Sequence, residues 1–160
     1  MIPVEDDKPG VVCASLAIFA WNEENAIPRA LDSLFRQSLF SHLRQLNQPC
    51  EILCVLNGCT DHSPLVAAQC LDRYQREHPD ASCFTTRVVN LLERSKINAW
   101  NQFVHRLSAP DVRVLFMMDA DILIHAPDTL WNMFHALETD PEASVAVDRP
   151  CKYIERGVST

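Results

Sequence analysis

The stretch Val11–Asn25, VVCASLAIFAWNEEN, decides the fold of this chain. Its first ten residues are almost continuously apolar, which is typical of a strand buried on both faces of a parallel sheet. Polar residues then end the strand abruptly. From Ile27 onward apolar residues recur with the period of an α-helix, and Pro28 suits the first turn of a helix. The stretch therefore predicts a strand followed by a helix, the repeating unit of an α/β fold.

The same strand–helix unit recurs along the rest of the chain. Four further runs have the length and composition of strands and are bounded by polar residues: Glu51–Leu56, Arg87–Leu91, Val112–Met118 and Ala143–Val147. This alternation predicts an α/β fold, a mostly parallel open sheet with helices on both faces. Such sheets bind ligands in the crevice at the carboxyl ends of their strands.

Three further helices are predicted between and after these strands. Ser63 followed by Pro64 is typical of an N-cap and a first helical residue, and this helix is expected to end at about Glu77. The next helix is expected to bury the face formed by Ile97, Trp100, Val104 and Leu107. Asp128 is expected to cap a last helix, whose inner face is Leu130, Trp131, Phe134 and Leu137.

The composition is that of a globular chain with few glycines. The 160 residues suit one domain, and the 48% hydrophobic and 22% charged residues argue against disorder. The glycines are Gly10, Gly58 and Gly157, whereas average usage would give about eleven. Dinucleotide-binding and Walker A loops need several glycines close together, so both kinds of phosphate loop are excluded.

The net charge and the hydropathy of the chain limit its possible binding partners and its cellular location. The net charge is −7 and no Lys/Arg cluster occurs, so nucleic acid is not expected as a partner. The first ten residues are acidic, unlike a secretory signal, and the longest apolar stretch, Val11–Trp21, is too short for a membrane span. We expect a soluble cytoplasmic protein, with peripheral association at the cytoplasmic face of a membrane left open.

The seven cysteines are predicted to be reduced. Their number is odd, no pair has C-x-x-C spacing, and most lie within apolar runs. A buried free thiol behaves as a small hydrophobic side chain, and such thiols are typical of reducing compartments.

Polar side chains gather after three of the predicted strands. In chain order these residues are Asn22, Glu23 and Glu24, then Asn57, Thr60 and Asp61, then Asp119 and Asp121. Because the carboxyl ends of parallel strands meet at the same edge of a sheet, we expect these side chains to form one site.

Asp119 and Asp121 give the sharpest of these signals. Two carboxylates at positions i and i+2, directly after a buried strand, can turn toward the same side, where they repel each other unless a cation lies nearby. Hard oxygen ligands suit Mn²⁺ or Mg²⁺, which then coordinate substrate phosphates. The alternative is that one aspartate caps a turn and the other is solvated. We favour the metal site because the other polar strand ends share this edge.

The remaining polar positions have both a functional and a structural interpretation. Asn57 can face a nucleoside with its amide as donor and acceptor, or can belong to a plain strand-to-helix turn at Gly58. Trp21 can stack on a base or pack in the core. Lys96 can neutralise a phosphate or be an ordinary solvated lysine, and Glu24 can simply favour the N-terminus of the next helix.

Four motifs occur in a fixed order along the chain: WNEE (21–24), NGCTD (57–61), K-x-x-A-x-N (96–101) and MMDAD (117–121). In this order they resemble the family 2 glycosyltransferases of the GT-A fold, over residues 14–148. The resemblance implies a domain that binds a nucleoside-diphosphate sugar with Mn²⁺ or Mg²⁺. It also implies transfer of the sugar to an acceptor hydroxyl with inversion.

The resemblance implies roles for single residues. Trp21 and Glu23 would lie near the base. Asn57 stands where the family usually has a base- or ribose-binding aspartate, so the choice of nucleotide stays open. Asp119 would lie by the ribose and the metal, with Asp121 as the main protein ligand of the metal. The whole implied donor-binding set is Ala20, Trp21, Asn22, Glu23, Asn57, Asp61, Lys96, Asp119 and Asp121.

The resemblance also implies a division of the chain. In the family the catalytic base lies farther beyond the D-x-D motif than the 39 residues that follow Asp121 here. We therefore expect a flexible segment at 1–10, a nucleotide-sugar-binding domain at 11–148, and a tail at 149–160 that leads to a missing acceptor half. Two alternatives stay open: a nucleotide- or metal-binding module without transfer activity, and a sugar nucleotidyltransferase, against which the acidic, glycine-free WNEEN loop argues.

Overall fold

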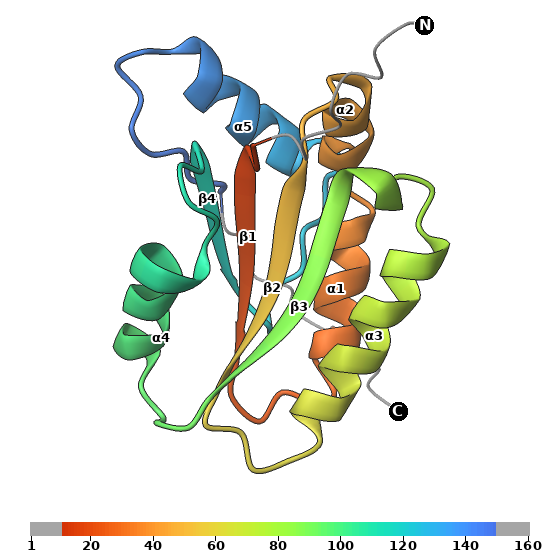
Figure 1. Cartoon of the computed structure of the whole chain (residues 1–160), viewed down its shortest axis with the longest axis vertical. Coiled ribbons are helices and arrows are strands. Elements are labelled where there is room, and N and C mark those ends of the chain that lie inside the picture. Colours follow the sequence, from red (N-terminus) through yellow and green to blue (C-terminus); the bar gives the residue numbers. More distant parts are fainter. Residues whose placement is uncertain (1–10, 150–160) are drawn as a thin grey trace, which may run out of the picture.

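The computed structural model describes residues 11–149 and contains an open sheet of four strands (Figure 1). The strands are β1 (Ala14–Ala20), β2 (Cys50–Asn57), β3 (Phe84–Leu91) and β4 (Val114–Asp119). Their spatial order is β3-β2-β1-β4, and every neighbouring pair is parallel. Parallel neighbours need long crossover connections, and each crossover here contains a helix. The predicted fold class is confirmed.

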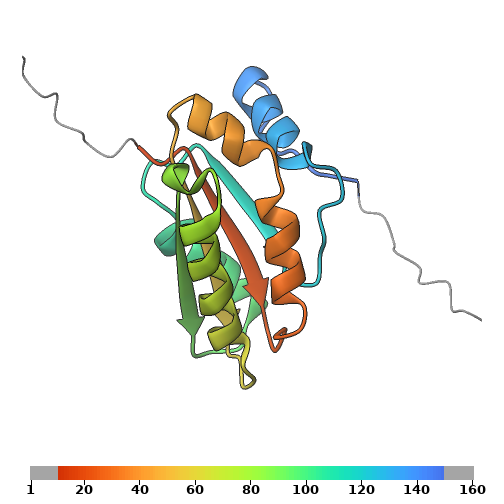
Figure 2. The ribbon, with the colours of Figure 1, turned by 90° about the vertical axis from the view of Figure 1, so that its right-hand side faces the viewer.

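Helices cover both faces of this sheet (Figures 1 and 2). One face packs against α1 (Ile27–Phe35), α2 (Leu39–Gln45), α3 (Ser63–Glu77) and α5 (Thr129–Thr139). The other face packs against α4 (Lys96–Gln102), which continues as a π-helical turn over Phe103–Leu107. A short 3₁₀ turn, Ala81–Cys83, precedes β3.

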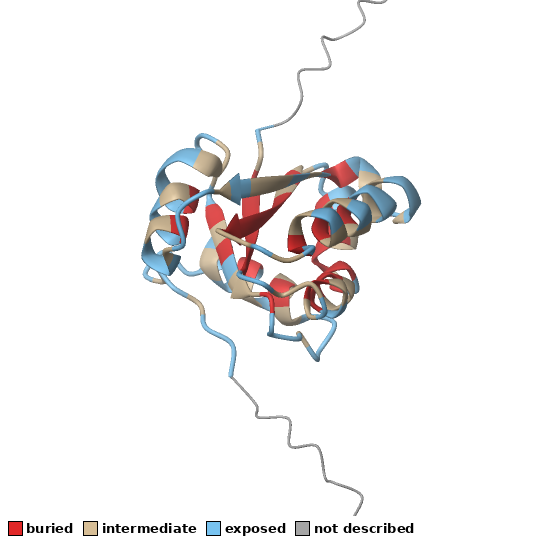
Figure 3. Ribbon diagram, turned by 90° about the horizontal axis from the view of Figure 1, so that it is seen from below, coloured by how far each residue is buried: buried red, intermediate tan, exposed pale blue. Residues whose placement is uncertain are grey.

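The central strand β1 is buried along its whole length, as its apolar run predicts. Leu16 and Ile18 pack on the α1 side of the sheet, whereas Ala17 and Phe19 pack on the α4 side. This division follows from the alternation of side chains along a strand. Figure 3 shows the buried strands at the centre of the fold, with the exposed faces of the helices around them. Burial of two apolar faces therefore fixes β1 in the middle of the sheet.

The strand and helix boundaries differ from the predicted ones in a few places. β1 and β4 begin later than predicted, whereas β3 begins earlier, at Phe84. α3 ends at Glu77 as predicted, but its N-cap residue is His62, so the prediction of Ser63 as N-cap was wrong. Ser63 is fully buried in the first turn, where its hydroxyl accepts a hydrogen bond from the backbone N–H of Glu23 (2.9 Å).

The predicted inner face of the helix at α4 was wrong for most of its residues. Ala99 and Phe103 are fully buried, while Ile97 is 75% exposed and Trp100 and Val104 are also exposed. The backbone widens into a π-helical turn after Gln102. Ala99 and Phe103 are four residues apart and so share one face of an ordinary helix, a different face from the predicted one.

The predicted strand at Ala143–Val147 is also absent. This segment has no regular secondary structure, and Val145 and Val147 are 76% and 83% exposed. Neither edge strand of the described sheet, β3 or β4, pairs with this segment, so its backbone groups gain no ladder hydrogen bonds. The apolar pattern alone was therefore insufficient to make a strand.

The six cysteines that the structure describes are free thiols, and four of them are buried: Cys13, Cys50, Cys54 and Cys83. Burial raises the pKa of Cys54 to about 12, so its thiol stays protonated at neutral pH. Cys151 lies outside the described residues, as do the predicted segment 1–10 and all but the first residue of the predicted tail 149–160. Within residues 11–149 no helix has the length and hydropathy to cross a bilayer.

Candidate functional site

The loops that follow β1, β2 and β3 lie together at the carboxyl edge of the sheet, at the lower end of Figure 1. A cavity of about 390 Å³ opens at this edge. Seven of the predicted site residues line it: Ala20, Trp21, Glu23, Asn57, Lys96, Asp119 and Asp121. They come from the ends of three parallel strands and from the start of α4, as expected from strands that end at one edge.

The β4 end of the cavity carries the two carboxylates of the D-x-D motif. The Nζ atom of Lys96 lies 2.6 Å from Oδ2 of Asp119, so these side chains form an ion pair that is partly exposed to solvent. The Asp121 carboxylate is exposed, and no other residue of 11–149 pairs with it or donates a hydrogen bond to it. The N–H of Ala120 donates to the carbonyl of Phe19 (2.9 Å), which ties the motif to the end of β1.

These carboxylates fit a divalent ion that a ligand helps to hold. Residues 11–149 contain no group of three or more His, Cys, Asp or Glu side chains placed to bind a metal on their own. Mg²⁺, however, is usually bound through one or two carboxylates together with water and substrate phosphates. The pair Asp119 and Asp121 matches that donor set, with Lys96 beside it as a further positive charge.

The β2 end of the cavity is formed by Asn57, a residue that is only 8% exposed. Its Oδ1 accepts a hydrogen bond from the backbone N–H of Ser95 (2.7 Å). The next residue, Gly58, donates its N–H to the carbonyl of Leu91 (2.9 Å). Together these bonds hold the loop after β3 against the end of β2.

Arg94 and Ser95 also line the cavity, and sequence reasoning missed both. The guanidinium carbon of Arg94 lies 3.3 Å from the centroid of the Trp21 ring, which places the cation over the aromatic face. The only signal in the sequence was a basic residue in the polar segment before α4. That signal does not say where the loop folds.

Asn22 and Asp61 do not line the cavity. Asn22 adopts a left-handed backbone conformation (φ 54°), and its Oδ1 accepts a hydrogen bond from the N–H of Thr60 (2.7 Å). The Asp61 carboxylate accepts hydrogen bonds from the N–H groups of Ser63 (3.0 Å) and Glu24 (3.2 Å). Both residues therefore join the loop after β1 to the loop after β2, behind the cavity wall.

The lowered pKa of Asp61 predicts that the stability of the fold depends on pH. Burial acts to raise its pKa, but hydrogen bonds from the hydroxyl and N–H of Ser63 and the N–H of Glu24 outweigh it, so the pKa lies below its ordinary value. A lowered pKa contributes stability above the unfolded pKa of about 3.9, and this is lost as pH falls through the folded pKa. In urea unfolding, Asp61→Asn is expected to be more destabilising at pH 7 than at pH 3. A loss of the same size at both pH values contradicts the assignment, and the exposed Asp72→Asn serves as the control.

Gly58 is required by both its backbone conformation and its surroundings. Its φ is +68°, and an added Cβ would lie 3.1 Å from the backbone nitrogen of Arg94. The left-handed conformation costs a non-glycine residue about 1–2 kcal/mol. Gly58→Ala is therefore expected to lower the free energy of unfolding by about 1–3 kcal/mol, because the contact with Arg94 adds to that cost. Unchanged stability in urea unfolding contradicts this reading of the turn.

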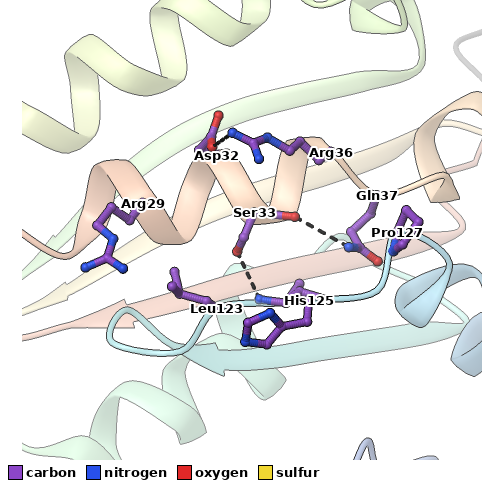
Figure 4. A pocket seen from close by; sticks show the side chains of 9 residues that line it. Arg29, Asp32, Ser33, Arg36, Gln37, Leu123, His125 and Pro127 are labelled. Atoms are coloured by element: carbon purple, nitrogen blue, oxygen red, sulfur yellow. Dashed lines mark hydrogen bonds and ion pairs between the residues drawn. The ribbon is translucent and has the colours of Figure 1, made fainter. Parts of the chain in front are cut away.

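A second cavity, of about 330 Å³, lies between α1 and the segment that follows Asp121 (Figure 4). None of the predicted site residues lines it. The Ser33 hydroxyl accepts a hydrogen bond from the N–H of Ile124 (3.1 Å), and the Gln37 amide donates to the carbonyl of Ala126 (2.9 Å). These contacts hold the segment after the D-x-D motif against α1. The candidate site is therefore the first cavity, which the predicted site residues line.

Two of the solved structures that are similar to this chain have the following likeness. One is the mannosyltransferase PcManGT from Pyrobaculum calidifontis in complex with GDP-Man and Mn²⁺, with a TM-score of 0.60 and 25% identity over 84% of this chain and 37% of that chain. The other is S. aureus TarS 1-349, with a TM-score of 0.56 and 18% identity over 78% of this chain and 32% of that chain. The likeness to TarS, at 18% identity, shows a shared fold. This chain thus spans about a third of the length of either structure.

The family model described as Glycosyl transferase family 2 matches residues 15–159. No curated protein matches the chain. The match covers nearly the whole sequence, and the sheet and its helices have the arrangement of GT-A glycosyltransferases. The chain therefore belongs to glycosyl transferase family 2.

Proposed function

We propose that the chain binds the donor in a metal-dependent glycosyl transfer, from a nucleoside-diphosphate sugar to an acceptor hydroxyl with inversion. The observation that carries this proposal is the cavity at the carboxyl edge, with Asp119 and Asp121 at one end and Trp21 and Asn57 at the other. Membership of family 2 supports it, as does the likeness to a mannosyltransferase in complex with GDP-Man and Mn²⁺.

The β4 end of the cavity suits the diphosphate. Asp119 and Asp121 would hold Mn²⁺ or Mg²⁺, which supplies Lewis-acid stabilisation of negative charge on a leaving group. Lys96 already lies within contact distance of Asp119. Once the Asp119 carboxylate faces a cation, the ammonium group of Lys96 is free to neutralise a phosphate oxygen. These residues therefore orient the diphosphate and balance its charge.

The β2 end of the cavity suits the nucleoside. The Arg94 guanidinium covers one face of the Trp21 ring. A base could stack on the other face, an interaction worth about 1–3 kcal/mol in other nucleotide-binding proteins. Asn57 and Glu23 add an amide and a carboxylate to the same wall. Asn22 and Asp61 support this end indirectly, because they hold together the two loops that carry its residues.

A second candidate function is donor binding without transfer. It is favoured by the share of PcManGT that this chain covers, 37%. Hydrolysis of a nucleoside-diphosphate sugar, measured with and without Mn²⁺, separates the two candidates. Mn²⁺-dependent release of free sugar supports the transferase, whereas binding without any release supports the binding module.

Binding itself is tested by calorimetric titration with UDP, GDP, CDP and ADP in the presence and absence of Mn²⁺. We expect at least one of these nucleotides to bind, and to bind much more tightly when the ion is present. Binding that is equally tight in excess EDTA contradicts the metal assignment, and no binding by any of the four contradicts the proposed function.

A further inference from the structure

The position of the Asp121 carboxylate is set by the backbone around it. The carboxylate is exposed and lines the cavity, and no residue of 11–149 forms an ion pair or hydrogen bond with it. On one side of Asp121 the backbone is held to the sheet, because the N–H of Ala120 donates to the carbonyl of Phe19 on β1 (2.9 Å). The direction of the side chain therefore depends on what holds the chain on the other side of Asp121.

Ser33 of α1 holds the chain on that other side. Its hydroxyl accepts a hydrogen bond from the N–H of Ile124 (3.1 Å), three residues beyond Asp121. The same hydroxyl donates to the carbonyl of Ala30 (2.8 Å), which occupies its proton and leaves a lone pair for Ile124. Figure 4 shows Ser33 pointing from α1 toward this segment. The turn that carries Asp121 is thus attached at both ends, to β1 and to α1.

Gln37 secures the same segment farther along the chain. The residue is only 4% exposed, and its Nε2 donates to the carbonyl of Ala126 (2.9 Å) while its Oε1 accepts from the N–H of Leu130 in α5 (3.1 Å). These two bonds use both ends of the amide and so fix its orientation. α1 itself is anchored in the core through Leu31 and Leu34, whose side chains are buried. The segment after the D-x-D motif is therefore held against a well-packed part of the fold.

We propose that Ser33 is a positioning residue for the metal-binding carboxylate of Asp121, with Gln37 in support. This inference rests on the proposed function of the cavity, which neither Ser33 nor Gln37 lines. A turn attached at both ends keeps Asp121 near the geometry that an ion requires, so less conformational entropy is lost when the ion binds. Without the hydrogen bond from Ile124 to Ser33, the turn has more freedom, and binding of the ion has to order it.

The test measures nucleotide binding by calorimetry, in Mn²⁺ and in EDTA, for the unaltered chain and for Ser33→Ala. The probe is whichever of UDP, GDP, CDP and ADP binds the unaltered chain most tightly. The ratio of the affinity in Mn²⁺ to the affinity in EDTA measures what the ion contributes to binding. We expect Ser33→Ala to lower this ratio about tenfold, the lower range for groups that support a metal ligand, and to leave the affinity in EDTA unchanged. Loss of a bond that only stabilises the fold would not change this ratio.

Two further variants serve as controls. Ser41→Ala alters a serine of α2 whose hydroxyl also donates to the carbonyl three residues earlier, that of Ser38 (2.9 Å). Among residues 11–149 this hydroxyl accepts no hydrogen bond from the segment after the D-x-D motif, so Ser41→Ala is expected to leave the ratio unchanged. Ser33→Thr keeps the hydroxyl and is expected to keep the ratio close to that of the unaltered chain. Equal urea midpoints for the two alanine variants show that any difference between them in binding reflects the site.

Three results overturn the inference alone. One is a ratio in Ser33→Ala equal to that of the unaltered chain, and another is a Ser33→Thr variant that loses as much as Ser33→Ala. The third is a loss of affinity in Ser33→Ala that is equal in Mn²⁺ and in EDTA, which would mean that Ser33 supports the whole cavity and not the ion. If none of the four nucleotides binds the unaltered chain, the proposed function fails first and this inference fails with it.

Discussion

Replacing Asp121 with asparagine is expected to abolish the Mn²⁺-dependent binding of a nucleoside diphosphate. The Asp121 carboxylate is exposed and lines the cavity, and no other residue of 11–149 pairs with it, so its charge is available to an ion. Asparagine keeps the size of the side chain but removes that charge. We expect apparent affinity to fall by more than about 100-fold, the upper range for groups that merely support a metal ligand.

The comparison needs a control for folding and for net charge. Asp72→Asn removes one charge from an exposed position on α3, outside the cavity, and is expected to leave binding unchanged. Equal urea midpoints for both variants show that any lost binding reflects the site. Calorimetry that finds the affinity of Asp121→Asn equal to that of the unaltered chain removes Asp121 as a metal ligand.

Phe103→Ala is expected to cost about 3–5 kcal/mol of unfolding free energy, the usual range for removing a buried aromatic ring. Phe103 is fully buried in the small cluster between α4 and the sheet, where its ring meets that of Phe19 edge to face (5.9 Å between centroids). The ring packs among Phe19, Leu53 and other apolar side chains of this cluster, so its removal is expected to leave a cavity. Urea unfolding measures the loss.

Ile97→Ala is the matched variant for the other face of the same helix. Ile97 is 75% exposed, so its truncation is expected to change stability by less than about 0.5 kcal/mol. The two variants together decide which face of α4 is buried. A larger loss of unfolding free energy for Ile97→Ala than for Phe103→Ala would mean that the buried face is the one predicted from the sequence.

The central strand and the location of the site were predictable because each depends on a strong local signal. A continuous apolar run leaves β1 only one stable place, in the middle of a parallel sheet. Polar residues at the ends of such strands then meet at one edge, as Asn57 and Asp119 do. Neither conclusion needed the exact bounds of an element.

Other features depend on contacts between distant segments, which a pattern does not report. Helical periodicity at α4 fits the face of Ile97 and Trp100 as well as that of Ala99 and Phe103, and only packing against the sheet decides that Ala99 and Phe103 are buried. Arg94 reaches the cavity because its loop packs on Gly58 and Ser95 bonds to Asn57. The Oδ1 atom of Asn57 holds the loop after β3, as the structural interpretation expects, and the role of Asn57 toward a nucleoside stays a prediction.

The most direct measurement follows the amide signals of ¹⁵N-labelled protein while Mn²⁺ is added to its complex with a nucleoside diphosphate. The paramagnetic ion broadens the signals of amides that lie near it. We predict that the amides of Asp119–Asp121 and Lys96 broaden first, while those of α2 and α5, at the opposite end of the sheet in Figure 1, stay sharp. Broadening that begins in α2 or α5, or that affects all amides equally, contradicts a nucleotide–metal site at the carboxyl edge.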